Sequence, residues 1–250
     1  MKNLDTGTLS LEQARHYRSQ GYYRLPRVFS SDETAEMREF VAAEAAKESE
    51  RARQVGGRAM KMYGLYDRNP EVMHRVIAHP VLVGALKSVL GPNVIFIKNR
   101  HNHATMNDQQ GGPPEGLHRD ILQPTRSILT AAVYLEESTV KNGATRLIPG
   151  SQEMPYVGVP EETGGGVWMA EHEEYAGLQD QAVSAPMPEG GVLLFSSLVF
   201  HGVGGNTSGG SRMSITLAYR AADELDANSD VARQIVVAGE QTYRGNDQFL

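Results

Sequence analysis

The sequence contains no cysteine among its 250 residues. Disulfide bonds, thiolate metal sites and cysteine nucleophiles are therefore all excluded. A basic block is absent too, since 24 Lys and Arg residues stand against 30 Asp and Glu residues and leave a net charge of −6. This balance argues against nucleic acid or an anionic membrane surface as the main partner.

Long hydrophobic runs are also missing. No apolar stretch approaches the roughly 18 residues of a membrane-spanning helix, and the first seven residues lack the apolar centre of a signal peptide. We therefore expect a cytoplasmic protein that does not associate with membranes. Hydrophobic residues make up 40% of the chain, which is enough for one domain over residues 1–250 with a sizeable core. The sequence is also compatible with a homodimer.

The first part of the chain, to about residue 92, carries mainly helical signals. Capping boxes begin at Ser10 and Ser30, and Gly91-Pro92 ends the helical group. A short strand is expected over 22–26, and residues 58–68 are ambiguous. The expected helices cover residues 10–20, 32–53, 70–78 and 80–90.

Short β-rich runs separated by Gly, Pro and Asn fill residues 93 to about 222. Helices followed by many strands predict an α+β, mainly β fold, namely an antiparallel barrel or jelly roll with the N-terminal helices packed on one sheet. Residues 223–250 form a polar tail. Asn142-Gly143 predicts a tight turn. The expected strands cover residues 94–101, 127–135, 144–149, 191–200 and 213–219.

The last of these strands alternates sharply. Its apolar side should pack under the helices, whereas its polar side should face into the barrel. The apolar side consists of Met213, Ile215, Leu217 and Tyr219, and the other side of Arg212, Ser214, Thr216 and Ala218.

The segment Gly116-Leu117-His118-Arg119-Asp120 is the strongest candidate for chemistry. In extended chain, His118 and Asp120 point to the same side. A third ligand would complete a two-histidine, one-carboxylate facial triad, which holds iron(II) on one face and leaves the other open. The candidate third ligand is His201, which closes the apolar run 191–200.

Arg212 follows His201 by eleven residues. An arginine fork beside the hydroxyl of Ser214 suits a bound carboxylate, because it donates bidentate, charge-assisted hydrogen bonds. Thr130 is a further candidate for the same cosubstrate site.

These residues resemble the His-x-Asp…His-x10-Arg pattern of the phytanoyl-CoA dioxygenase-like branch of the iron(II)/2-oxoglutarate-dependent oxygenases. Residues 9–30 are similar to that family's N-terminal helix and strand, and Asn142–Ser151 to its Asn-Gly…Pro-Gly-Ser segment. The resemblance implies a double-stranded β-helix of the cupin-like type. It also implies that the two histidines and Asp120 bind iron, and that Arg212 takes the distal carboxylate of 2-oxoglutarate.

The resemblance further implies oxidation of a small-molecule substrate by O₂, with release of succinate and CO₂. Related halogenases have a small residue where Asp120 stands, so the carboxylate favours hydroxylation. Desaturation, ring closure and epimerisation begin with the same hydrogen abstraction. Secondary-metabolite tailoring or an amino-acid-like substrate is the expected role.

The pair His101 and His103 offers a rival metal site. A cupin-type isomerase or binding module without 2-oxoglutarate would use such a pair, but the glutamate expected after it is absent. Candidate substrate contacts are Arg119, Trp168 and Asn102. Residues 151–185 hold few strand signals and are expected to form a lid.

Overall fold

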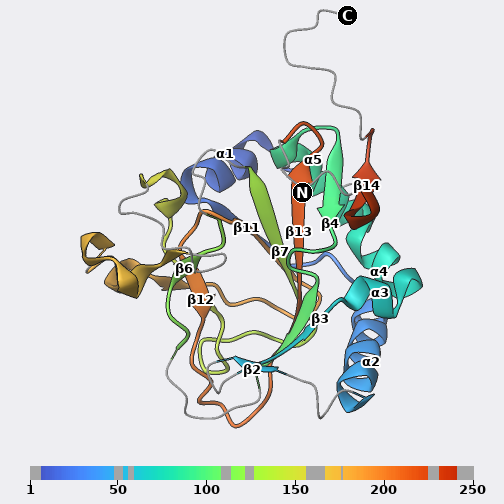
Figure 1. Ribbon diagram of the computed structural model, residues 1–250, viewed down its shortest axis with the longest axis horizontal. Coiled ribbons are helices and arrows are strands. Elements are labelled where there is room, and N and C mark those ends of the chain that lie inside the picture. The colour runs from blue at the N-terminus through green and yellow to red at the C-terminus, as the bar shows by residue number, and fades with distance from the viewer. Residues whose placement is uncertain are drawn as a thin grey trace, which may run out of the picture.

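Two antiparallel β-sheets face each other in this protein, and helices cover the outer side of the larger sheet (Figure 1). The computed structural model describes residues 7–47, 53–55, 59–107, 114–121, 127–155, 167–175, 177–224 and 231–240. This arrangement confirms the predicted jelly roll with N-terminal helices on one sheet.

The larger sheet has the order β1-β11-β7-β13-β5-β3-β2, and β4 joins it through β13 and carries β14 on its other side. Its longest strand, β13, pairs with β7 over seven residue positions. The strands are β1 (Tyr22–Leu25), β2 (Arg53–Val55), β3 (Ala59–Tyr63), β4 (Val94–Ile97), β5 (His103–Met106), β7 (Ile128–Tyr134), β11 (Val192–Ser196), β13 (Met213–Ala221) and β14 (Gln234–Ala238).

The smaller sheet has the order β10-β8-β12-β6-β9 and consists of strands of only two or three residues. It contains the segments that carry the predicted metal ligands. The strands are β6 (His118–Arg119), β8 (Thr145–Leu147), β9 (Val167–Trp168), β10 (Val183–Ser184) and β12 (His201–Val203).

Both predicted capping boxes are present. Ser10 Oγ accepts a hydrogen bond from the backbone N–H of Gln13, and Ser30 Oγ accepts one from that of Glu33. Among the described residues, no helix is both long and apolar enough to cross a lipid bilayer. The helices are α1 (Leu11–Gln20), α2 (Ser31–Lys47), α3 (Leu65–Arg68), α4 (Pro70–Ile77) and α5 (Pro80–Leu90).

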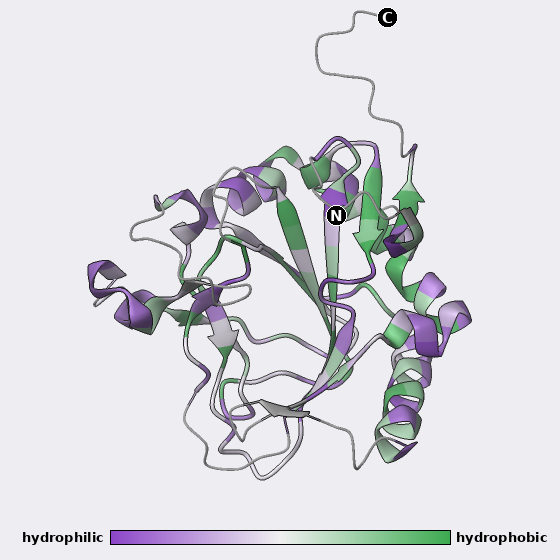
Figure 2. Ribbon diagram, in the orientation of Figure 1, coloured by the Kyte–Doolittle hydropathy of each residue, from purple (hydrophilic) through white to green (hydrophobic). Residues whose placement is uncertain are grey.

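The main core lies between these helices and the larger sheet, where Figure 2 shows apolar colour along the strands. The alternation predicted for β13 is confirmed. Met213, Ile215, Leu217 and Tyr219 are buried in this core, and the Tyr219 hydroxyl donates to the carbonyl of Ile77 in α4 at 3.2 Å.

Several element boundaries differ from the predictions. The described part of α2 ends at Lys47 instead of continuing to 53, because Arg53–Val55 pairs with β3. The strand predicted over 94–101 stops at Ile97, and that over 191–200 stops at Ser196. The polar tail also adds a strand, since β14 pairs with β4 and supplies hydrogen bonds that an exposed edge would lack.

The predicted turn at Asn142-Gly143 generates a test of this fold. Gly143 has φ +88°, and an added Cβ would lie 2.5 Å from the carbonyl oxygen of Gly204. Gly143→Ala should therefore cost more than the roughly 1–3 kcal/mol of backbone strain alone, measured by urea unfolding. Gly177→Ala is the matched control, because Gly177 has φ +83° with no atom within 4 Å of the added Cβ. Equal losses in the two variants would contradict the packing described here.

Candidate active site

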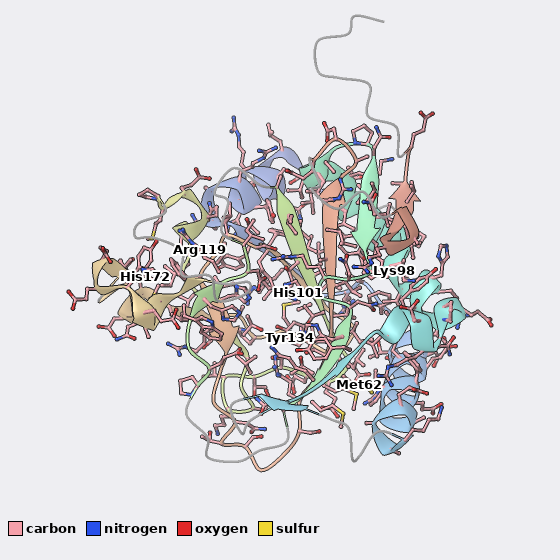
Figure 3. The ribbon with its side chains drawn as sticks, in the orientation of Figure 1. Met62, Lys98, His101, Arg119, Tyr134 and His172 are labelled. Carbon is pink, nitrogen blue, oxygen red and sulfur yellow. The ribbon has the colours of Figure 1, made fainter. Side chains whose placement is uncertain are left out.

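A cavity open to solvent lies between the two sheets, and polar side chains from both sheets line it. Figure 3 shows His101 and Tyr134 near the centre of the molecule in this region. The lining residues are Lys61, His101, His103, Thr105, Glu115, His118, Asp120, Thr130, Ala132, Thr145, Phe195, His201, Gly202, Val203, Arg212, Ser214 and Thr216.

The three predicted metal ligands meet in this cavity. His118 in β6 and His201 in β12 are directly paired across the smaller sheet, so both imidazoles lie on the same face with ring centroids 4.6 Å apart. The Nε2 atoms of His118 and His201 each lie 3.6 Å from an oxygen of Asp120. One ligand atom from each residue falls within 4.8 Å of the others, which is close enough for one metal ion.

Backbone carbonyls orient both imidazoles for this role. His118 Nδ1 lies 3.3 Å from the carbonyl of Gly116, and His201 Nδ1 lies 2.9 Å from that of Val199. A proton on Nδ1 donated to these carbonyls leaves the Nε2 lone pairs free for a metal. Burial lowers the pKa of His118 and the nearby His201 lowers it further, so the ring stays neutral.

Asp120 follows β6 and is held by its backbone N–H, which donates to the carbonyl of Ser197 at 2.9 Å. Burial raises the pKa of its carboxyl group, but the imidazoles of His101, His201 and His118 outweigh burial and hold that pKa well below its usual range. Asp120 is therefore ionised. Its Oδ2 atom lies 3.0 Å from Nε2 of His101, and its Oδ1 atom lies 3.6 Å from Nε2 of His118.

Arg212 lies on the far side of the cavity, immediately before β13, and is only 2% exposed. Burial lowers the pKa of its guanidinium. Its Nε atom is buried without a hydrogen-bond partner, and no carboxylate of the described residues forms an ion pair with it. A buried cation without a counter-ion is costly, so this site is suited to an anionic ligand.

Residues with hydroxyl groups line the cavity and approach the guanidinium. The predicted residues Ser214 and Thr130 are buried and line the same cavity. The sequence analysis did not identify Tyr134, whose ring lies 5.7 Å from the guanidinium carbon and whose hydroxyl lies 2.8 Å from Thr145 Oγ1. The alternation of β7 contains that signal, because Thr130 and Tyr134 are four residues apart and share one face.

Trp168, a predicted substrate contact, lies beside the candidate metal site. It pairs with His118 between β9 and β6, and the two rings are 4.5 Å apart with a tilt of 31°. Trp168 is 38% exposed. The predicted lid is described over 151–155, 167–175 and 177–185, where it forms the 3-10 turns η1 (Ser151–Glu153), η2 (Met169–Glu171), η3 (Glu173–Tyr175) and η4 (Leu178–Gln181) together with β9 and β10.

Arg119 does not lie where the sequence analysis put it. Its side chain is 1% exposed, points away from the cavity, donates to the carbonyls of Ser151 and Met154 at 2.6 and 3.1 Å, and lies 4.4 Å from the Phe200 ring. Figure 3 shows it apart from His101, toward the side of the smaller sheet. Adjacent strand residues face opposite sides of a sheet. Because His118 and Asp120 face the cavity, Arg119 between them faces the other side.

Asn102 is also outside the cavity. Its Nδ2 atom donates to the carbonyl of Lys98 at 3.1 Å, and its Oδ1 atom accepts from the backbone N–H of Tyr66 at 3.0 Å. These bonds hold the turn after β4 in place, and the side chain is not among those that line the cavity. By contrast, His101 and His103 both line the cavity.

Comparison with known proteins agrees with this geometry. Residues 17–214 match the phytanoyl-CoA dioxygenase (PhyH) family. The chain belongs to this family. Rat peroxisomal phytanoyl-CoA dioxygenase is 23% identical over 274 residues, covering 96% of this chain and 78% of the rat protein.

Two solved structures have the same fold. The epimerase SnoN, in complex with Fe³⁺, alpha ketoglutarate and nogalamycin RO, superposes with a TM-score of 0.70 at 19% identity, over 88% of this chain and 87% of SnoN. EctD from S. alaskensis with bound Fe has a TM-score of 0.66 at 25% identity, over 90% and 80% of the two chains. This PhyH-family protein is a non-haem iron dioxygenase that uses Fe(II), with 2-oxoglutarate and O₂ as cosubstrates.

Metal binding should stabilise the protein measurably. A ligand at 100 times its dissociation constant adds about 2.7 kcal/mol to the free energy of unfolding, so anaerobic Fe(II) or Mn(II) should raise the melting temperature. His201→Ala should lose this rise without losing the fold. The control is His74→Ala, since His74 is exposed on α4 and its removal should leave the rise intact. An undiminished rise in His201→Ala would place the metal elsewhere.

Proposed function

We propose that this enzyme hydroxylates an unactivated C–H bond of a small polar metabolite, with His118, Asp120 and His201 as the Fe(II) ligands and Arg212 as the anchor of 2-oxoglutarate. Succinate and CO₂ are the coproducts. The observation that carries the proposal is the pairing, in one cavity, of a three-residue ligand cluster with a buried guanidinium that forms no ion pair with any described carboxylate.

The donor set fits Fe(II). Two imidazoles and one carboxylate form a site with only three protein ligands, which leaves positions for cosubstrates. The buried carboxylate of Asp120 is ionised, and a cation bound within this cluster would compensate its charge. The bound iron supplies the redox chemistry that couples oxidative decarboxylation of 2-oxoglutarate to oxidation of the substrate.

The residues around Arg212 fit the other end of 2-oxoglutarate. A carboxylate there would supply a counter-ion, since no carboxylate of the described residues forms an ion pair with Arg212. Ser214 lies two residues from Arg212 and lines the same cavity, whereas Thr130 lines the cavity farther along β7, opposite Ala218. The cupin-type alternative on His101 and His103 has less support. Among the described residues, the only group of three possible metal ligands is the one that contains His118 and excludes both of them.

Two residues bear on the reaction outcome. The carboxylate of Asp120 fills the position at which a small residue would leave room for a halide, which favours hydroxylation. The indole of Trp168 lies against His118 and would restrict water beside the site.

The described lining supports a polar substrate more than an acyl chain. Its apolar side chains are Ala132, Phe195 and Val203, whereas Lys61 and Glu115 bring opposite charges, 3.9 Å apart, to the same wall. A long hydrocarbon would exclude water from this ion pair without offering it a polar contact. An amino-acid-like compound or a polar secondary metabolite suits the cavity better.

A substrate panel tests this proposal. Purified enzyme with Fe(II), 2-oxoglutarate and O₂ is assayed for succinate and for product masses one oxygen atom higher than the substrate. Turnover is expected with amino-acid-like or other small polar metabolites. Turnover restricted to acyl-CoA substrates would overturn the substrate class, and products without added oxygen would overturn hydroxylation.

Arg212→Lys should weaken 2-oxoglutarate binding. Lysine keeps the charge but loses the planar fork, and the loss of one charged hydrogen bond, about 1.5–3 kcal/mol, raises the dissociation constant about tenfold to a hundredfold. Metal affinity should not change. Arg220→Lys is a matched control from the same strand, because the Arg220 guanidinium is buried but donates to the carbonyl of Glu224 outside the cavity. Unchanged 2-oxoglutarate affinity in Arg212→Lys would contradict the assigned anchor.

Trp168→Ala should uncouple the two half-reactions. Removing the indole opens the site beside His118 to water, so the ratio of succinate to hydroxylated product should rise above that of the wild type. Val140→Ala removes a side chain that is 64% exposed and outside the cavity, and it should leave the ratio unchanged. If Trp168→Ala stays fully coupled, the indole does not shield the reaction.

A further inference from the structure

The turn between β4 and β5 contains an unusual backbone conformation. His101 has φ +45°, and it is the only non-glycine residue with positive φ among those described. Its imidazole turns into the cavity, and its Nε2 atom lies 3.0 Å from Oδ2 of Asp120. This distance is shorter than the 3.6 Å between Asp120 and either predicted histidine ligand.

Neighbouring residues hold the turn in this conformation. The guanidinium of Arg100 donates to the backbone carbonyl of Asp120. On the other side of His101, the side chain of Asn102 bonds to the backbone of Lys98 and Tyr66. Three consecutive residues thus fix the position of the turn relative to Asp120.

The conformation has an energetic cost that a glycine would avoid. A non-glycine residue in the left-handed region persists only where the surrounding structure determines it, and such residues gather at functional sites. Here the result is that Nε2 of the ring lies within hydrogen-bonding distance of Oδ2 of Asp120. His103 shares the cavity but lies on the next strand, its ring 5.7 Å from that of His101 and 5.3 Å from that of Tyr63.

We propose that His101 is a positioning residue, which donates from Nε2 to the Asp120 oxygen that does not bind the metal. Asp120 is thereby held as a ligand through one oxygen, and the remaining metal positions stay open for the cosubstrates. This inference rests on the proposed metal site. His101 itself contacts no reacting atom in this role and acts through Asp120, as groups behind metal ligands commonly do.

Three substitutions separate the hydrogen bond from the backbone strain. His101→Gln keeps a donor and the strained backbone, His101→Ala keeps only the strain, and His101→Gly removes both donor and strain. The readouts are the Mn(II) dissociation constant by calorimetry without 2-oxoglutarate, and the melting temperature of the metal-free protein. Activity is not needed for either measurement.

The role assigned to His101 predicts that metal affinity follows the donor. His101→Gln should bind Mn(II) nearly as well as the wild type, whereas His101→Ala and His101→Gly should both bind about 10–100-fold more weakly. The metal-free melting temperature of His101→Gly should be no lower than that of His101→Ala, because the strain is gone. His101→Gly should therefore bind Mn(II) more weakly even though the variant is folded.

Three results would overturn the inference. Equal affinity in all four proteins would mean that His101 does not act on Asp120. Recovery in His101→Gly but not in His101→Gln would mean that only the backbone matters. Loss in His101→Gln equal to that in His101→Ala would make His101 a metal ligand in its own right.

The variant His118→Ala separates this inference from the proposed function. If His118→Ala binds Mn(II) as tightly as the wild type, the assigned metal site is wrong. If His118→Ala loses binding while every His101 variant retains wild-type affinity, the metal site stands and only the role of His101 fails.

Discussion

Two buried charges, one at each end of the same cavity, are the main constraint on this structure. The carboxylate of Asp120 lies among imidazoles, and the guanidinium of Arg212 lies opposite, with no ion-pair partner in the part of the chain that the structure describes. Burying a charge costs several kcal/mol unless a partner compensates it. The folded protein bears this cost for both charges before any ligand binds. A cation can then pair with Asp120, and a dicarboxylate can pair with Arg212. Stability and function therefore oppose each other at these two residues.

The two sheets have different roles in supporting these buried charges. The larger sheet and its helices form the main apolar core, and β13 connects that core to the cavity by exposing alternate residues to each. The smaller sheet consists of short strands, yet the pairing of His118 with His201 fixes two imidazoles side by side. Arg119 stabilises this sheet from behind, where it bonds to η1 and packs on Phe200. The larger sheet thus holds the anchor, and short strands of the smaller sheet hold the two histidine ligands.

The sequence predicted the residues that could carry chemistry better than it predicted the strand boundaries and the contacts between distant segments. The i, i+2 spacing of His118 and Asp120 and the alternation of β13 are local signals, and both correctly predicted which side chains share the cavity. The pairing of β14 with β4 and the early end of β4 depend on contacts between distant segments, which no local pattern records. Arg119 was misassigned because a charged residue between two ligands suggests a binding surface, whereas strand alternation turns it to the face of the smaller sheet away from the cavity. His101 was noticed only as a rival ligand, since its positive φ and its distance to Asp120 exist only in the folded chain.

A crystal structure of the anaerobic complex with Mn(II) and 2-oxoglutarate tests the central claim most directly, because anomalous scattering locates the metal independently of any assumed site. The account predicts a metal peak at bonding distance from Nε2 of His118, Nε2 of His201 and one oxygen of Asp120. It also predicts the distal carboxylate of 2-oxoglutarate on the guanidinium of Arg212. A metal peak held by His101 and His103, or a 2-oxoglutarate molecule bound away from Arg212, would contradict it.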